Sequence, residues 1–356
     1  MKKLLLATLV CTATTHAAPA APSDLPLPVY WLDMDVLRAL EARAQEGELW
    51  QGRIINIPPV LESAARLGPV VWSERFGVAA DKLREFAHHP GEERQGIWGF
   101  RDAASAKAAF EHLDREGFAA LPGGEKALGT PGELDLIAID EFWRPVGEPV
   151  VFALRGDLLW QGSNLPEPPP DPWHQILWQP TLSAVRTALP EDAQLLQAGI
   201  FTIEQGIQQS ESDIADILLQ PGKKDPEKIM AALAPAEDGL PPYLGGVIAD
   251  AQHGDKAILQ LTLIYPDCDT AEKAKAALPA RWQAWKMRGK MVPDSGSLDT
   301  RTLKPGQRSN HCYAMLHHVS DNPRVEEHPA LRAAWGAFYR GQFGVIAIAI
   351  PVENRE

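Results

Sequence analysis

The sequence predicts an α+β fold of two similar, duplicated domains, each a mostly antiparallel sheet backed by helices. The chain has 356 residues, which exceeds the size at which one hydrophobic core stops growing, so two domains are expected. Apolar residues make up 45% and charged residues 23%, an ordinary globular composition. Segments of the first half also recur in the second half, about 165 residues later. These three observations favour paired domains.

The chain begins with the pattern of a secretory signal peptide. Two lysines precede a short apolar run at 4–10, and small residues follow up to Ala17 and Ala20. The apolar run is too short to span a bilayer. We therefore expect residues 1–20 to be a signal peptide, cut after Ala17 or Ala20. The mature protein is then periplasmic or secreted and has no transmembrane segment.

The internal matches place the first α+β domain at 21–190 and the second at 191–356. The first pair of matching segments reads as an apolar strand, a polar break and an alanine-rich helix. The second pair reads as a helix that begins with proline and is followed by an apolar strand, and the third as a strand that runs into a helix. The three pairs are 96–113 with 261–278, 180–189 with 329–338, and 29–40 with 195–207.

Helix starts and hairpin turns follow from local residue chemistry. Ser105 in the first copy, and Asp269 or Thr270 in the second, are suitable N-caps because their side-chain oxygens can accept hydrogen bonds from unpaired backbone N–H groups. Residues 150–162 and 245–265 each contain two alternating apolar runs around a Gly-Asp pair, which predicts two β-hairpins.

The predicted mature chain keeps two cysteines, Cys268 and Cys312. In an oxidising compartment an isolated pair most simply forms a disulfide. The bond would close a loop of about 45 residues, which the chain-entropy relation converts to about 4 kcal/mol of stabilisation.

Composition argues against nucleic acid as a partner. The formal net charge is −13, which repels nucleic acid and anionic lipid headgroups. The sequence has no dense run of Lys and Arg with interleaved aromatic residues. We therefore expect an unknown ligand or an envelope protein as the partner.

The stretch NHCYAMLHHV at 310–319 raises the question of a metal site. In a strand, His311 and His317 share one face but stand about 20 Å apart, too far to bind one ion. In a helix, His311, Met315 and His318 would line one side and could hold copper. Turn residues on both sides and the β-forming composition favour the strand, so no metal site is expected.

Motifs of catalysis and cofactor binding are not found in the sequence. It has no G-x-S-x-G elbow, no H-E-x-x-H helix and no Gly-rich phosphate loop, so no cofactor is expected. The catalytic and ligand-binding residues remain unknown at this level. The pairs Asp33/Asp35 and Asp267/Asp269 stand at helix starts, where helix capping explains them.

These observations favour an exported, non-enzymatic protein that binds a small ligand or a protein partner. A cleft between the two domains, or the Trp- and Pro-rich segment at 165–178, would hold it. One alternative is a hydrolase with a carboxylate pair that has no fixed sequence spacing. The other is a structural component of the envelope.

Overall fold

A computed structural model describes most of the predicted elements. The predicted signal peptide, the segment 329–338 and the Trp- and Pro-rich segment lie outside the described residues. The described residues are 29–41, 70–89, 95–121, 127–130, 143, 149–162, 179–202, 240–241, 243–288, 296–304 and 311–320.

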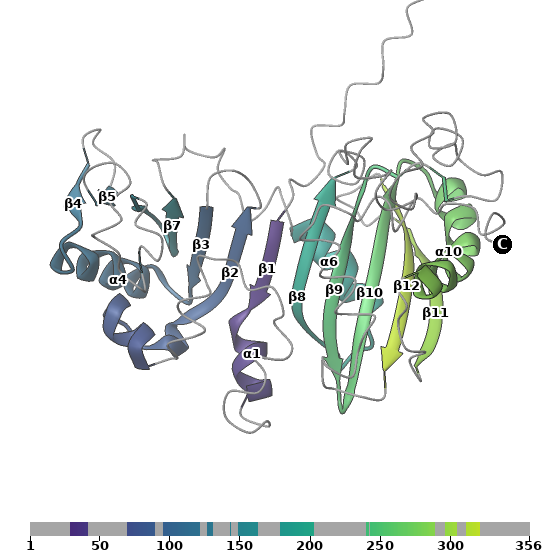
Figure 1. The fold of residues 1–356 in the computed structure, drawn as a ribbon, viewed down its shortest axis with the longest axis horizontal. Coiled ribbons are helices and arrows are strands. Elements are labelled where there is room, and N and C mark those ends of the chain that lie inside the picture. Colours follow the sequence, from purple (N-terminus) through teal and green to yellow (C-terminus); the bar gives the residue numbers. More distant parts are fainter. Residues whose placement is uncertain are drawn as a thin grey trace, which may run out of the picture.

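The described strands form one 12-stranded antiparallel sheet, in the order β11-β12-β10-β9-β8-β1-β2-β3-β7-β6-β5-β4 (Figure 1). The α+β class and the antiparallel pairing are thus confirmed. The strands are β1 (Val29–Asp33), β2 (Leu83–His89), β3 (Gln95–Phe100), β4 (Ala119–Ala120), β5 (Ala127–Gly129), β6 (Val151–Arg155), β7 (Leu158–Gly162), β8 (Gln194–Thr202), β9 (Gly245–His253), β10 (Lys256–Tyr265), β11 (Ser297–Leu303) and β12 (Cys312–Ser320).

The expectation of one sheet for each domain is corrected by the pairing of β1 with β8. Tyr30 lies opposite Gly199, and Trp31 lies opposite Ala198. Two edge strands that would otherwise leave backbone N–H and C=O groups unpaired satisfy each other here. The result is one continuous sheet with a seam between β1 and β8.

Helices cover both faces of this sheet. The labelled α-helices are α1 (Met34–Glu41), α4 (Ala103–Arg115), α6 (Gln179–Ala188) and α10 (Cys268–Arg288), and residues 70–76 are also helical. A short 3-10 helix, η1, covers Ala80–Lys82. Leu37, Leu113 and Leu278 bring α1, α4 and α10 into one core cluster on one face. Leu182 and Val185 of α6 pack into a second cluster on the other face. Figure 1 shows α10 and α6 on opposite sides of the second half of the sheet.

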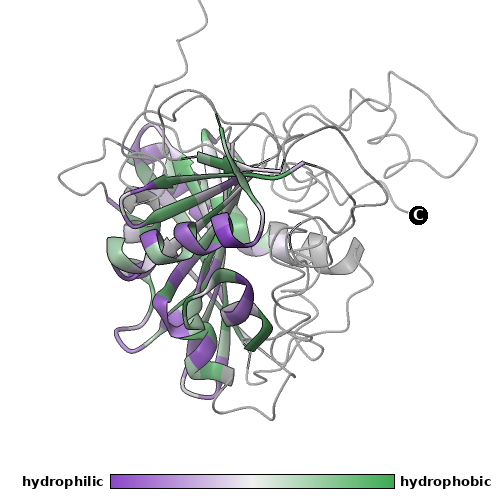
Figure 2. Ribbon diagram, turned by 90° about the vertical axis from the view of Figure 1, so that its left-hand side faces the viewer, coloured by the Kyte–Doolittle hydropathy of each residue, from purple (hydrophilic) through white to green (hydrophobic). Residues whose placement is uncertain are grey.

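This layered arrangement determines which side chains are exposed and which are buried. Figure 2 shows hydrophilic and hydrophobic stretches alternating along the helices, as expected for elements that bury one side only. In the first half of the sheet, aromatic side chains fill the core. Phe76 is fully buried, with ring centroids of Trp72, Trp98 and Trp143 at 4.5, 5.0 and 4.8 Å.

Both predicted hairpins are confirmed. Arg155 pairs with Leu158, and His253 pairs with Lys256, so each turn has two residues. The first turn residues, Gly156 and Gly254, have φ angles of 60° and 57°. Glycine adopts this left-handed conformation without a steric penalty, which is why the Gly-Asp pairs predict the turns.

The residues named as N-caps of two helices lie two or three positions too late, although the expected capping role of Asp267 is confirmed. Asp102, not Ser105, caps α4, since its Oδ1 accepts a 2.7 Å hydrogen bond from the Ser105 backbone N–H. Asp267 in the same way accepts a 2.7 Å hydrogen bond from the Thr270 N–H at the start of α10. The predicted cap residues therefore supply the N–H donors, and an aspartate three positions earlier supplies the acceptor.

The predicted disulfide joins Cys268 and Cys312, with their Cα atoms 5.0 Å apart. It connects the first residue of α10 to the first residue of β12. Cys312 also lies opposite Tyr265, the last residue of β10. In the part of the chain that the structure describes, no helix is both long and apolar enough to cross a membrane.

Candidate functional site

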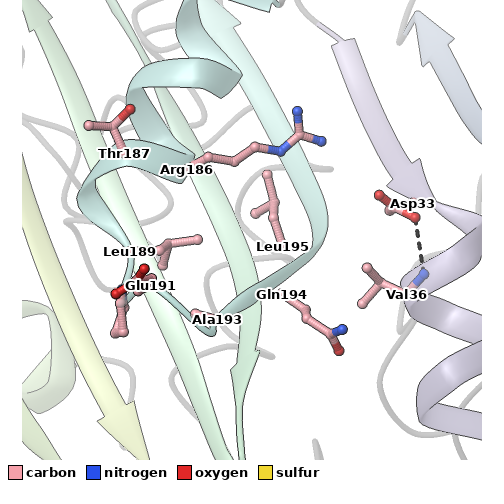
Figure 3. A pocket seen from close by; sticks show the side chains of 10 residues that line it. Asp33, Val36, Arg186, Thr187, Leu189, Glu191, Ala193, Gln194 and Leu195 are labelled. Atoms are coloured by element: carbon pink, nitrogen blue, oxygen red, sulfur yellow. Dashed lines mark hydrogen bonds between the residues drawn. The ribbon is translucent and has the colours of Figure 1, made fainter.

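A hollow of about 560 Å³ lies at the seam of the sheet, on the side covered by α6. One wall is the connection from α6 to β8, and the other is the junction of β1 with α1 (Figure 3). It therefore lies at the predicted domain boundary near residue 190. Its lining residues are Asp33, Val36, Arg186, Thr187, Leu189, Pro190, Glu191, Ala193, Gln194 and Leu195.

A tight turn builds the first wall. The Leu189 N–H donates to the Arg186 carbonyl at 3.2 Å, and the Ala193 N–H donates to the Pro190 carbonyl at 2.9 Å. Proline cannot continue a helix, so the chain turns here and enters β8. The buried side chains of Leu189 and Leu195 anchor the two ends of the turn in the core. The turn is thereby fixed against the sheet.

Arg186 supplies the positive charge of the hollow. Its guanidinium carbon lies 5.2 Å from the ring centroid of Trp31, a cation–π contact. The Trp31 ring is fixed in turn, because its Nε1–H donates a 2.9 Å hydrogen bond to Glu85. Arg186 makes no ion pair with any residue that the structure describes. Within the described part of the chain, its donors therefore have no ion-pair partner and remain available to the hollow.

Asp33 supplies a half-buried carboxylate at the end of β1. Its Oδ1 accepts hydrogen bonds from the backbone N–H groups of Asp35 at 2.9 Å and of Val36 at 3.0 Å. Burial raises the pKa of Asp33, and these two hydrogen bonds oppose the rise. The negative charge of Asp35 raises the pKa further, and the positive charge of Arg186 lowers it. Among the described residues, Oδ2 of Asp33 receives no hydrogen bond.

Glu191 and Gln194 complete the polar lining. Both side chains are exposed, and neither has a hydrogen-bond partner within the described ranges. Figure 3 shows the side chains of Arg186 and Gln194 extending from α6 and β8 towards the β1–α1 junction. The hollow thus combines one guanidinium, two carboxylates and one amide with apolar walls. Such a lining can bind a small molecule that carries both an acidic group and a hydrogen-bond donor.

Sequence reasoning predicted no residue of this site, although it singled out Asp33 for another role. Asp33 was expected to cap a helix, and it does so with one oxygen while the other faces the hollow. Its predicted companion Asp35 instead pairs with Arg38 and Arg101. Arg186 and Gln194 follow no motif, because only the seam between β1 and β8 brings them opposite Asp33. Pro190 marks the break between a predicted helix and a predicted strand, and this break was the signal in the sequence that could have indicated a site here.

The histidine-rich stretch forms β12, as predicted. Met315 packs on the same face as Tyr313, near α6. His317 and His318 are consecutive in the strand and so point to opposite faces. His318 stacks on Trp282 of α10, with ring centroids 5.3 Å apart. Among the described residues, no three His, Cys, Asp or Glu side chains gather as a metal site would require.

Comparisons with models of protein families, with curated proteins and with solved structures found no match to this chain. The seam hollow has polar groups with hydrogen-bonding capacity that no described residue uses, so it is the feature on which a function can be based. Its polar groups lie on elements from both halves of the sheet.

Proposed function

We propose that the protein is an exported, non-enzymatic binding protein that holds a small polar ligand in the seam hollow. One observation carries this proposal. The donors of Arg186, the second oxygen of Asp33 and the side chains of Glu191 and Gln194 have hydrogen-bonding capacity that no described residue uses. Groups arranged in this way around a concave surface are what a ligand requires.

The lining defines the chemical class of the ligand. A guanidinium binds a carboxylate through two parallel hydrogen bonds, so Arg186 fits an acidic group. Asp33 lies on the opposite wall, where its carboxyl group can accept hydrogen bonds from an ammonium or hydroxyl group of the ligand. Val36 and Leu195 offer apolar contact to the carbon skeleton between them. A small amino acid or hydroxy acid satisfies all three contacts.

A thermal-shift screen of the mature protein with amino acids, hydroxy acids and dicarboxylic acids tests this proposal. A ligand that binds only the folded state raises the unfolding midpoint in a concentration-dependent way. We expect amino acids or hydroxy acids to give the shift, and Arg186→Gln to remove it.

Arg155→Gln is the matched control. Arg155 also lies over a tryptophan, Trp160, at 5.9 Å from the ring centroid, but it does not line the hollow. This variant should keep the ligand-induced shift. A shift that survives in Arg186→Gln, or the lack of any shift across the screen, would contradict the proposed function.

The hydrolase alternative has one observation in its favour. Burial raises the pKa of Asp33, and a raised carboxyl pKa suits a general acid. Asp33→Asn keeps the helix cap, because the amide oxygen can accept the same backbone hydrogen bonds. Hydrolysis of chromogenic glycosides by the wild type and its loss in Asp33→Asn would support this alternative, whereas inactivity of the wild type would remove it.

We also propose that the two halves derive from one duplicated unit. Outward from the seam, the first five strands of each half follow the orders β1-β2-β3-β7-β6 and β8-β9-β10-β12-β11, which match position by position. The strands β5 and β4 extend the first half beyond these five. A helix follows the third strand in each half, and an aspartate caps each helix, Asp102 in α4 and Asp267 in α10. The equivalence of these caps at the predicted shift of about 165 residues supports the proposal.

The proposed export has a separate support and a separate test. A disulfide between Cys268 and Cys312 is typical of proteins that fold in an oxidising compartment. Expression of the full chain in a bacterium should yield a periplasmic or secreted form that lacks the first 17 or 20 residues. The mass of the purified protein measures this, and an uncut chain that stays in the cytoplasm would contradict export.

A further inference from the structure

Within the residues that the structure describes, the edge strand β11 has one side without a partner strand. It ends the sheet beyond β12, and in the described part of the chain it pairs with β12 alone (Figure 1). It has seven residues, whereas β4 at the opposite end of the sheet has two. A long edge strand presents a row of backbone donors and acceptors to other chains. The open side of β11 is therefore a candidate interaction surface.

Side chains of opposite charge flank the middle residue of β11. Asp299 and Arg301 flank Thr300 and lie on the same face of the strand, joined by a 2.7 Å ion pair. Their side chains are 55% and 54% exposed. Leu298, at 38%, is one of two large hydrophobic side chains exposed within the described residues. The edge thus offers one negative charge, one positive charge and an apolar contact.

We propose that β11 pairs with β11 of a second copy of this chain, antiparallel and with the two-fold axis at Thr300. In this register all seven residues of the strand are paired. Asp299 lies opposite Arg301 of the partner subunit, and the symmetry repeats the same pair on the other side of the axis. Leu298 lies opposite Thr302 of the partner subunit. The contact is isologous, so it closes after two copies.

The charges exclude the neighbouring registers. Strands slide past one another in steps of two residues if the same faces are to stay together. One step in one direction places the two Asp299 side chains opposite each other, and one step in the other direction does the same for Arg301. Like charges directly opposite each other destabilise a strand pair. The charge pattern therefore selects the register in which every residue of β11 has a partner.

A different interpretation of the same residues is that the charges protect a monomer from edge-to-edge association. Charge reversal distinguishes the proposed dimer from a monomer with a protected edge. In the dimer, Asp299→Arg or Arg301→Asp places like charges opposite each other twice, whereas the double variant Asp299→Arg/Arg301→Asp restores both ion pairs. Charges that only protect an edge would keep the wild type and all three variants monomeric.

Sedimentation analysis of the mature full chain and its variants measures this difference. We expect a concentration-dependent dimer for the wild type, at least a tenfold weaker dimer for each single variant, and recovery in the double variant. Lys107→Glu/Glu111→Lys is the matched control, since this exposed ion pair lies on α4. It should leave the association unchanged. A monomeric wild type, or single variants that dimerise as well as the wild type, would overturn the proposal.

A cysteine cross-link tests the register directly. Thr300 lies on the two-fold axis, where opposed Cα atoms are about 4.5–5.5 Å apart, within the range of a disulfide. Ser297 lies about 20 Å from its own symmetry mate. Under mild oxidation Thr300→Cys should form a covalent dimer and Ser297→Cys should not. Equal cross-linking of the two variants would contradict this register.

Discussion

Gln197 of β8 donates a 2.9 Å hydrogen bond from its amide to the carboxylate of Asp250 on β9, in the buried part of the sheet. The Tyr30 hydroxyl of β1 donates a 3.1 Å hydrogen bond to the side-chain carbonyl oxygen of Gln197. Asp250 is fully buried. A buried carboxylate depends on its donors because water cannot replace them. This chain of three polar residues therefore connects β1, β8 and β9 across the seam.

Gln197→Leu should lower the free energy of unfolding by about 2–4 kcal/mol, because it removes a hydrogen-bond donor from the buried carboxyl group of Asp250. Gln161→Leu is the control, since Gln161 is also buried in the sheet but accepts its 2.9 Å hydrogen bond from the neutral Trp98 indole. It should cost about 1 kcal/mol less. Urea denaturation measures both, and a larger loss for Gln161→Leu would refute the importance of Asp250.

His317 should make the protein less stable in mild acid. Burial, together with the positive charge of Arg301, lowers its pKa from 6.5 to about 4, against the opposing effect of Asp299. Between these two pKa values the unfolded chain binds a proton that the folded chain does not, so the free energy of unfolding falls as the pH falls. The loss reaches about 3 kcal/mol near pH 4.

The variant His317→Gln has no such proton to bind, so its stability should fall less between pH 7 and pH 4. Urea denaturation of the wild type and the variant at several pH values measures the difference. Parallel pH curves for the two proteins would show that another group titrates.

The disulfide should contribute about 4 kcal/mol, as expected for a bond that closes a loop over a sequence separation of 44 residues. The double variant Cys268→Ser/Cys312→Ser should lose this stabilisation. A reducing agent should destabilise the wild type to the same level and leave the double variant unchanged. If the reducing agent acted equally on both proteins, the effect would lie elsewhere.

Loss of the aspartate caps should lower stability, and the effect should depend on acid. Hydrogen bonds from Ser105 lower the pKa of Asp102, and those from Thr270 do the same for Asp267. Each carboxylate therefore stabilises the fold above its unfolded pKa, and this contribution is lost as the pH falls through its folded pKa.

Asp102→Ala and Asp267→Ala should each lower the thermal midpoint at neutral pH. The Asn variants should stay close to the wild type, because an amide oxygen still accepts the backbone hydrogen bond. Thermal unfolding followed by circular dichroism compares them, and equal losses for the Ala and Asn variants would exclude a capping role.

Local chemistry made many elements predictable. The Gly-Asp turns gave both hairpins, and the sequence of 29–40 gave the strand β1 and the helix α1. The cap residues were displaced because aspartate and serine are both good caps, and only geometry shows which one accepts the hydrogen bond. Cys268 and Cys312 were predictable because no other pairing was open to the expected mature chain.

Long-range pairing was not predictable in the same way. Each half of the sequence contains the pattern of a sheet. No local sequence pattern indicates that the first strand of one half pairs with the first strand of the other. The site depends on this pairing, because Asp33 and Arg186 belong to opposite sides of the hollow. Patterns of period two or 3.6 carry no information on such a contact.

The β1–β8 pairing joins segments that are far apart along the chain. Tyr30 contacts Gln197, which follows 167 residues later. Before β8 is in place, the backbone groups on one edge of β1 lack the partners that β8 provides. Contacts between residues so distant along the chain form slowly. We therefore expect folding to need a chaperone that binds the unfolded chain, or to end in a slow step in which the two halves of the sheet pair.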